Sequence, residues 1–237
     1  MLDAVVADPL RPRNAYSPAV PSVAGLPRKQ STTIGFGAFG TIARFARDET
    51  IFSEGDEARY CYKVIGGAVR VSKVMLDGRR QIVDFLLADD LFAIDGDETH
   101  VLTAEAIGTV VLARYSRANL QRLSEDAPEL RREILTALRR DLAAAQHHLL
   151  MLGRQSARER LASFLLLLAN RRKHESGNRV DLPMSRQDMA DYLGLTIETV
   201  CRTFAELKRL NVVATAERQY VVICNPNVLR AIAAGIN

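Results

Sequence analysis

The sequence predicts an α+β fold: an N-terminal antiparallel β-roll, then a long helix, then a smaller C-terminal unit. Three observations predict it. Short runs rich in β-branched and aromatic residues alternate with Asp-Gly and Gly-Gly turn signals over residues 35–120. A strip of leucines with helical spacing follows Pro128. Two capped helical segments and two short β-rich runs come after it, and 237 residues are enough for two domains of roughly 100–200 residues each.

Residues 1–33 are predicted to be a disordered tail. They contain five prolines and show no apolar periodicity. A segment of this composition has too little apolar surface to bury, so no folded core is expected in it.

Residues 34–125 are predicted to form the β-roll. The candidate strands are Tyr60–Ile65, Val69–Val74, Gln81–Leu87 and Thr109–Tyr115. The turn signals between such runs are Gly55-Asp56, Gly66-Gly67, Asp77-Gly78 and Asp95-Gly96-Asp97. Regular short strands separated by such turn signals are typical of a small antiparallel roll or barrel.

Residues 126–152 are predicted to form one long helix that serves as a dimer seam. Pro128 suits the first turn of a helix, where its missing N–H costs nothing. Apolar residues then recur at alternating spacings of three and four, as in an a/d seam: Leu135, Leu138, Leu142, Ala145, Leu149 and Leu152. The alternative is that this strip packs on the protein's own roll. We favour a homodimer, because a single solvent-facing helix needs no such strip.

Composition and motifs exclude several classes of protein. The longest apolar run, Leu161 to Ala169, is much shorter than the ~20 residues of a membrane span. No secretory signal is visible, so we expect a cytoplasmic protein with no membrane partner. The three cysteines have no CxxC spacing, so neither a zinc site nor a disulfide framework is indicated. We expect no cofactor, and no Ser/His/Asp, metal or P-loop motif indicates an enzyme.

Positive charge is concentrated at the C-terminal end of the chain. Residues 153–237 carry 13 basic and 8 acidic side chains, whereas residues 34–125 carry 11 and 14. A polyanion would be attracted to the C-terminal domain rather than to the roll.

Residues 153–237 contain two capped helices joined by a tight turn. Ser185 is a good N-cap for a helix over Arg186–Leu193. Gly194 allows a tight turn, and Thr196 caps a second helix over Ile197–Arg209. This order is that of a helix-turn-helix unit, in which the second helix reads DNA.

The second of these helices has two distinct faces, and a wing is expected after it. Val200, Phe204 and Leu207 share the face expected to pack on the domain. The opposite face carries Glu198, Cys201, Arg202 and Ala205. Glu can accept from a cytosine amino group, and Arg can donate twice to guanine. The alternative is an exposed i, i+4 Glu–Arg pair worth a few tenths of a kcal/mol. The runs Val212–Val213 and Tyr220–Ile223 are expected to form a wing hairpin.

The face of this helix that carries Glu198, Cys201, Arg202 and Ala205 is expected to read DNA and is called the reading face. Cys201 on this face is a candidate redox switch. Its position near a helix N-terminus favours a thiolate, which oxygen converts to sulfenic and then higher acids. A new negative charge there would oppose DNA phosphates. The alternative is a cysteine that merely contacts a phosphate. Cys61 and Cys224, assigned to strands, are expected to be buried.

The stretch from Ser185 to Arg202, with SRQDMA, LGLTIETVCR and the helix-turn-helix spacing, resembles the DNA-binding domain of the CRP–FNR family of transcription regulators. Ile51–Asp56 and Asp77–Ile82 resemble segments of the same family, and so does the order of roll, long helix and winged helix-turn-helix. The resemblance covers about residues 36–225 and is greatest to the FixK branch, which regulates nitrogen-fixation and microaerobic genes. It implies a cyclic-nucleotide-binding-like roll and a winged helix-turn-helix.

The resemblance also implies roles for particular residues. Arg186, Thr196 and Thr199 match phosphate-contacting positions, and Glu198 and Arg202 match base readers. The implied partners are a palindromic double-stranded operator of the TTG…CAA type and RNA polymerase, with activation as the implied outcome. Ile197 stands where the cyclic-AMP receptor has Arg, and a thymine methyl would suit it. The candidate polymerase surface is the turn Asp77, Gly78, Arg79 and Arg80, which can equally be a solvated hairpin.

The sequence departs from the family at its effector sites. Members that bind cyclic AMP hold it with a Glu and an Arg-Ser pair, where this chain has Ile94 and His100-Val101. Members that bind an iron–sulfur cluster use N-terminal cysteines, and residues 1–60 contain none. We therefore predict a regulator that needs no effector. The alternative is a ligand-gated regulator, or a small-molecule-binding signalling module, with an unidentified effector in the roll.

Overall fold

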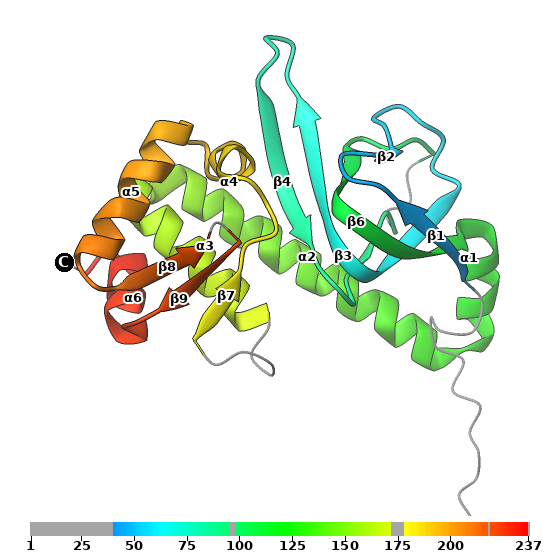
Figure 1. The fold of residues 1–237 in the computed structure, drawn as a ribbon. Coiled ribbons are helices and arrows are strands. Elements are labelled where there is room, and N and C mark those ends of the chain that lie inside the picture. The colour runs from blue at the N-terminus through cyan, green and yellow to red at the C-terminus, as the bar shows by residue number, and fades with distance from the viewer. Residues whose placement is uncertain (1–39, 95–97, 172–177, 218, 237) are drawn as a thin grey trace, which may run out of the picture. The chain divides into compact units, whose positions relative to one another are not determined.

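The computed structural model describes residues 40–94, 98–171, 178–217 and 219–236 (Figure 1). The tail predicted for residues 1–33 and the turn predicted at Asp95-Gly96-Asp97 lie outside the described residues. Within the described part, a β-roll is followed by helices and then by a small three-stranded sheet with further helices. The predicted α+β class is confirmed.

The roll is one antiparallel sheet of six strands in the order β1-β6-β3-β4, with β2 paired to β6 and β5 to β3. Its strands are β1 (Thr41–Phe45), β2 (Thr50–Phe52), β3 (Tyr60–Val74), β4 (Arg80–Leu86), β5 (Leu91–Phe92) and β6 (Thr103–Ser116). Strands β3 and β4 form a long hairpin, and the Asp77-Gly78 turn predicted at its tip is confirmed by Gly78, whose φ is +83°.

The turn predicted at Gly66-Gly67 is wrong, because β3 continues through both glycines. The pairing of β3 with β6 shifts register on either side of Gly66, which is the signature of a bulge. Gly67 has φ +88°, and a Cβ there would lie 2.5 Å from the carbonyl oxygen of Thr109. The glycine pair therefore allows a kink and a close approach of strands rather than a chain reversal.

Three helices follow the roll: α1 (Arg117–Asp126), α2 (Pro128–Arg154) and α3 (Ala157–Arg171). The long helix predicted over residues 126–152 is α2, which begins at Pro128 and ends at Arg154. Its buried residues are Leu130, Ala137, His148 and Met151. The predicted seam lies on another face: Leu135, Leu138, Leu142, Ala145 and Leu149 are exposed, and Leu152 is half-buried. Leu138 and Ala145 border a cavity between α2 and the roll, so packing on the protein's own roll fails to account only for the other exposed members of the strip, Leu135, Leu142 and Leu149.

The C-terminal domain contains a three-stranded sheet in the order β7-β9-β8. Its elements are β7 (Arg179–Asp181), α4 (Arg186–Leu193), α5 (Ile197–Arg209), β8 (Val213–Glu217), β9 (Tyr220–Ile223) and α6 (Pro226–Ala233). The bounds predicted for α4 and α5 are confirmed, and β8 with β9 forms the wing hairpin. The sequence did not predict α1 or α6. Among the described helices, none is both long and apolar enough to cross a membrane.

One hydrophobic core joins the C-terminal domain to β4. Phe85 of β4 lies 6.0 Å from Phe164 of α3 and 5.3 Å from Tyr192 of α4, measured between ring centroids. His148 of α2 stacks on Tyr192 at 4.1 Å and hydrogen-bonds its carbonyl oxygen at 2.8 Å. The roll, α2 and α4 therefore meet around Tyr192, and this junction supports the helix-turn-helix.

Candidate nucleic-acid interface

Local hydrogen bonds define both ends of the turn between α4 and α5. The Ser185 hydroxyl accepts from the backbone N–H of Asp188 at 3.0 Å, and Asp188 accepts in return from the N–H of Ser185 at 3.0 Å. The helix ends at Gly194, whose left-handed φ of +61° is adopted most easily by glycine. Thr196 then caps α5 by accepting from the N–H of Thr199 at 3.3 Å. The start of α5 is thus fixed by short-range chemistry.

Arg160 of α3 connects this turn to the end of α2, and sequence reasoning missed it. Its guanidinium donates to the carbonyl oxygens of Gln155 at 2.8 Å, Leu152 at 3.0 Å and Leu193 at 2.8 Å. These acceptors lie at the C-terminal ends of α2 and α4, where carbonyl groups lack helical partners. The available sequence signal was an arginine directly before a leucine-rich helical stretch, and the structure shows that it is half-buried.

The two faces predicted for α5 are confirmed. Val200, Phe204 and Leu207 are buried in the domain core, together with Thr203. The opposite face is exposed at Glu198, Cys201, Arg202 and Ala205. This face therefore presents one hydrogen-bond acceptor, one thiol and one bidentate donor that could enter a groove of DNA.

Threonines hold the two candidate base readers. Arg202 donates to the hydroxyl of Thr199 at 3.4 Å. The pKa of Glu198 is lowered from its usual value by its own backbone N–H and then by a hydrogen bond from Thr196, so the side chain is an ionised acceptor. Among the ion pairs of the described residues none joins Glu198 to Arg202, whose guanidinium donates to Thr199 instead, so the simple Glu–Arg surface pair is not formed.

Of the candidate phosphate contacts, Arg186 is the one most restricted by neighbouring side chains. Its guanidinium lies 3.5 Å above the Phe204 ring and donates to the sulfur of Met189 at 3.2 Å. Burial lowers the pKa of Arg186, with Cys201 acting in the opposite sense. Thr196 is exposed, whereas Ile197 and Thr199 are half-buried. The Arg186 guanidinium is therefore already engaged by Phe204 and Met189.

The three cysteines occupy different environments. Cys201 is exposed and not disulfide-bonded. Cys61 is buried, as predicted, and burial raises the pKa of its thiol to about 11. The expected burial of Cys224 is wrong, because β9 ends at Ile223 and the thiol lies on exposed chain beyond it. Two exposed thiols are therefore available to an oxidant.

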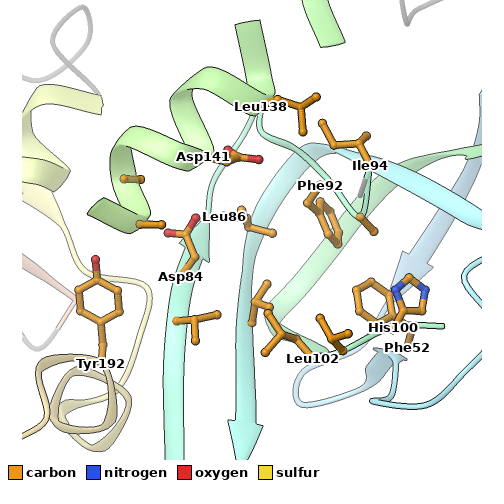
Figure 2. Close-up of a pocket in the computed structure, with 16 residues that line it drawn as sticks. Phe52, Asp84, Leu86, Phe92, Ile94, His100, Leu102, Leu138, Asp141 and Tyr192 are labelled. Atoms are coloured by element: carbon orange, nitrogen blue, oxygen red, sulfur yellow. The ribbon is translucent and has the colours of Figure 1, made fainter. Parts of the chain in front are cut away.

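The roll contains a cavity of about 420 Å³ against α2 (Figure 2). Ile94, His100 and Val101, the residues in the family's effector positions, all line it. Asp84 of β4 and Asp141 of α2 also line it, and the described lining side chains include no Arg or Lys. Burial raises the pKa of Asp84 to about 6, against the influence of Arg171. Such a cavity disfavours an anionic ligand.

Comparison with known proteins gives matches over both halves of the chain. Residues 42–127 match the family described as the cyclic nucleotide-binding domain, and residues 159–232 match the Crp-like helix-turn-helix domain. The chain is 41% identical over 191 residues to the nitrogen fixation regulation protein FixK of Rhizobium meliloti, covering 81% of this chain and 86% of that protein. It is 43% identical over 181 residues to FixK of Bradyrhizobium diazoefficiens, covering 76% of each. The solved structure of FixK2 from Bradyrhizobium japonicum is similar at 35% identity and a TM-score of 0.77, over 81% of this chain and 96% of that one.

Proposed function

Because this chain belongs to the CRP–FNR family of transcription regulators, which are not enzymes, we propose that it is a homodimeric activator that binds a palindromic operator without a small-molecule effector. The observation that carries the proposal is the exposed face of α5, where Glu198 and Arg202 lie in the first two turns. By similarity to the FixK proteins, its target genes include those of nitrogen fixation, and the family resemblance adds microaerobic genes.

Exposure of the α2 strip supports the homodimer. The side chains of Leu142 and Leu149 are 61% and 72% exposed, and Leu135 and Leu138 are exposed as well. Four exposed leucines on one stripe leave apolar surface in water, which is unfavourable in free energy, and a second copy would bury this surface. The a/d spacing matches a two-helix seam.

A two-fold dimer explains why the operator is a palindrome. Two copies of α5 related by a two-fold axis read half-sites centred about one helical turn, roughly 34–36 Å, apart. By family resemblance the half-sites contain TTG and CAA. Glu198 and Arg202 read base edges, Ile197 contacts a thymine methyl, and Arg186, Thr196 and Thr199 contact phosphates.

The test is selection of bound sites from random double-stranded DNA by the purified protein without added ligand. Recovery of a palindrome with TTG and CAA half-sites supports the proposal. Recovery of unrelated sequences at equal frequency would reject sequence-specific binding, and recovery of single half-sites would reject the dimer.

A second function, ligand-gated regulation, is favoured by the cavity in the roll. Its walls combine Phe52, Phe92 and Leu86 with the carboxyl groups of Asp84 and Asp141, so a small apolar ligand with a cationic group would fit them best. A ligand that raises both the melting temperature and the operator affinity would establish this function over effector independence.

The tip of the β3–β4 hairpin is our candidate surface for RNA polymerase. Arg79 is 83% exposed and pairs only locally, with Asp77 at 2.7 Å, and Gly78 forms the turn. Arg80 differs, because its side chain is ion-paired to α4. The surface open to a partner is therefore Asp77 to Arg79, and Arg80 is the least available of the four predicted residues.

Oxidation of Cys201 is our candidate for control of DNA binding. The thiol lies on the reading face between Glu198 and Arg202 and is exposed. An acid formed there would oppose the DNA phosphates and add bulk in the groove.

A further inference from the structure

A cluster of charged side chains joins the roll to the first helix of the helix-turn-helix. Arg80 of β4 donates to Asp188 at 2.7 Å and to Asp191 at 2.8 Å, both on α4. Arg70 of β3 lies 3.6 Å from the same oxygen of Asp188. The side chains of Arg70, Asp188 and Asp191 are only 11%, 6% and 14% exposed. The cluster is therefore largely shielded from solvent, where ionic contacts are least screened.

The two carboxylate oxygens of Asp188 have separate partners. Oδ2 accepts from the backbone N–H and the hydroxyl of Ser185, which caps α4. Oδ1 accepts from Arg80. The same side chain therefore caps α4 and ties its first turn to the roll. The low pKa of Asp188, which Ser185 and both arginines hold down against the effect of burial, keeps it charged.

The contacts continue on both sides of Arg80. Gln81 donates to the carbonyl oxygen of Tyr192 at 3.3 Å, and Gln187 donates to the second oxygen of Asp191 at 2.7 Å. On the roll side, Arg70 also pairs with Glu105 at 3.0 Å and Asp48 at 3.1 Å. Asp188 is thus shared by Arg70, which belongs to the network within the roll, and by Arg80, which alone of the two also pairs with Asp191.

Arg79 provides the contrast. It is the neighbour of Arg80 on the same hairpin and carries the same charge, but its partner is Asp77 in its own turn. The hairpin and the α4–α5 turn line one groove of about 1160 Å³, and both arginines border it together with Thr196 and Glu198. If only local charge mattered for DNA, the two arginines would be equivalent.

We propose that Arg80 is a positioning residue for operator binding. Through Asp188 and Asp191 it fixes α4 against the roll, and the Gly194 turn and shared core carry this placement to α5. It also neutralises two carboxylates on the helix whose first residue is the candidate phosphate contact Arg186, which removes a repulsion toward DNA. The inference rests on the proposed operator binding. It states that a contact between the roll and α4 sets the orientation of the helix-turn-helix for that binding.

The test compares Arg80→Glu with the matched control Arg79→Glu in the full-length protein, using fluorescence anisotropy on the selected operator. Arg80→Glu is expected to weaken operator binding by about tenfold or more, because a charge pair is replaced by repulsion. Arg79→Glu is expected to bind like the wild type in this assay, which contains no polymerase. The charge swap Arg80→Glu with Asp191→Arg is expected to recover most of the affinity.

A second measurement does not need DNA. Hydrogen exchange of the α4 amides, residues 186–193, is expected to accelerate in Arg80→Glu and to stay unchanged in Arg79→Glu. If Arg80→Glu fails to fold, Arg80→Gln takes its place, with faster α4 exchange and a smaller loss of affinity expected, because the ion pairs are lost without new repulsion.

Equal losses of affinity in the two single variants, or unchanged exchange and affinity in the Arg80 variant, would overturn the inference. A wild type that binds no selected site would instead count against the proposed function, and the exchange measurement would still decide whether Arg80 holds α4.

Discussion

Among single residues, Arg202 has the clearest expected effect on base reading. Replacing it with Ala removes a two-donor contact, so we expect operator affinity to fall by ~1–3 kcal/mol and preference to relax at one base pair. Repeating the site selection with Arg202→Ala measures both. Arg209→Ala is the matched control, since Arg209 is exposed at the far end of α5. Equal weakening at all sequences would show that Arg202 contacts only phosphate.

Cys201 and Cys224 allow a clean test of redox control. Both thiols are exposed, but only Cys201 lies on the reading face of α5. We expect Cys201→Ser to bind the operator normally and to keep its affinity after peroxide treatment, because serine cannot form a sulfur acid. The variant Cys224→Ser should lose binding in peroxide as the wild type does. Peroxide sensitivity in Cys201→Ser, measured by anisotropy, would assign the effect to another side chain.

Asp84 makes folding stability depend on pH. Its folded pKa of about 6 lies above its ordinary value of 3.8, so the native state holds the proton more tightly. Its contribution therefore favours the native state below about pH 4 and is lost as pH rises through 6. At pH 7.5, Asp84→Asn is expected to raise the free energy of unfolding by on the order of 1 kcal/mol.

Denaturant unfolding at pH 5 and pH 7.5 measures the effect of Asp84→Asn. The gain should shrink at the lower pH. Asp89→Asn is the control on the neighbouring exposed turn, where the side chain is 89% exposed. A gain that is the same at both pH values would show that the Asp84 carboxyl does not titrate in this range.

Among the elements, α2 is the one in which substitutions test the proposed dimer interface. Leu142→Asp together with Leu149→Asp places two charges on the exposed strip, where a partner helix would have to desolvate them. We expect monomers in sedimentation and loss of operator binding, with the helical circular dichroism retained. Ala143→Asp, also exposed on α2 but outside the strip, should remain dimeric. A dimer that survives the double change would place the interface elsewhere.

The elements that the sequence predicted well are those with local chemistry at their ends. Ser185 and Thr196 cap the starts of α4 and α5 through hydrogen bonds to residues three positions on, and Gly194 ends α4 through its backbone angle. These signals are local, so the bounds of both helices can be predicted from the sequence. Gly66-Gly67 carries the same local signal as a turn, and only pairing with β6 makes it a bulge. Cys224 was misplaced for a similar reason, since one residue decides whether it lies in β9 or beyond it.

For the molecule as a whole, the long-range contacts escaped prediction. Turn chemistry placed Arg80 on an exposed hairpin, but its partner Asp188 lies 108 residues away in the chain. Arg160 likewise meets Leu193 across 33 residues. The exposed face of α5 was predictable because a helix face is set by spacing alone. The contacts that orient that face depend on the tertiary fold, which periodicity does not specify.

The proposed effector independence concerns the whole protein, and cyclic AMP tests it directly. A bound ligand stabilises the native state by RT ln(1 + [L]/Kd), about 2.7 kcal/mol at a concentration near 100 times Kd. The cavity opposes the cyclic phosphate with Asp84 and Asp141, and its described walls offer no Arg or Lys. We therefore expect millimolar cyclic AMP to leave both the melting temperature and the operator affinity unchanged. Because a Tm shift reports any binding to the native state, it also detects a ligand that binds without affecting DNA. A rise in Tm alone would show that the roll has kept a nucleotide site, and a rise in operator affinity with it would establish ligand gating in place of effector independence.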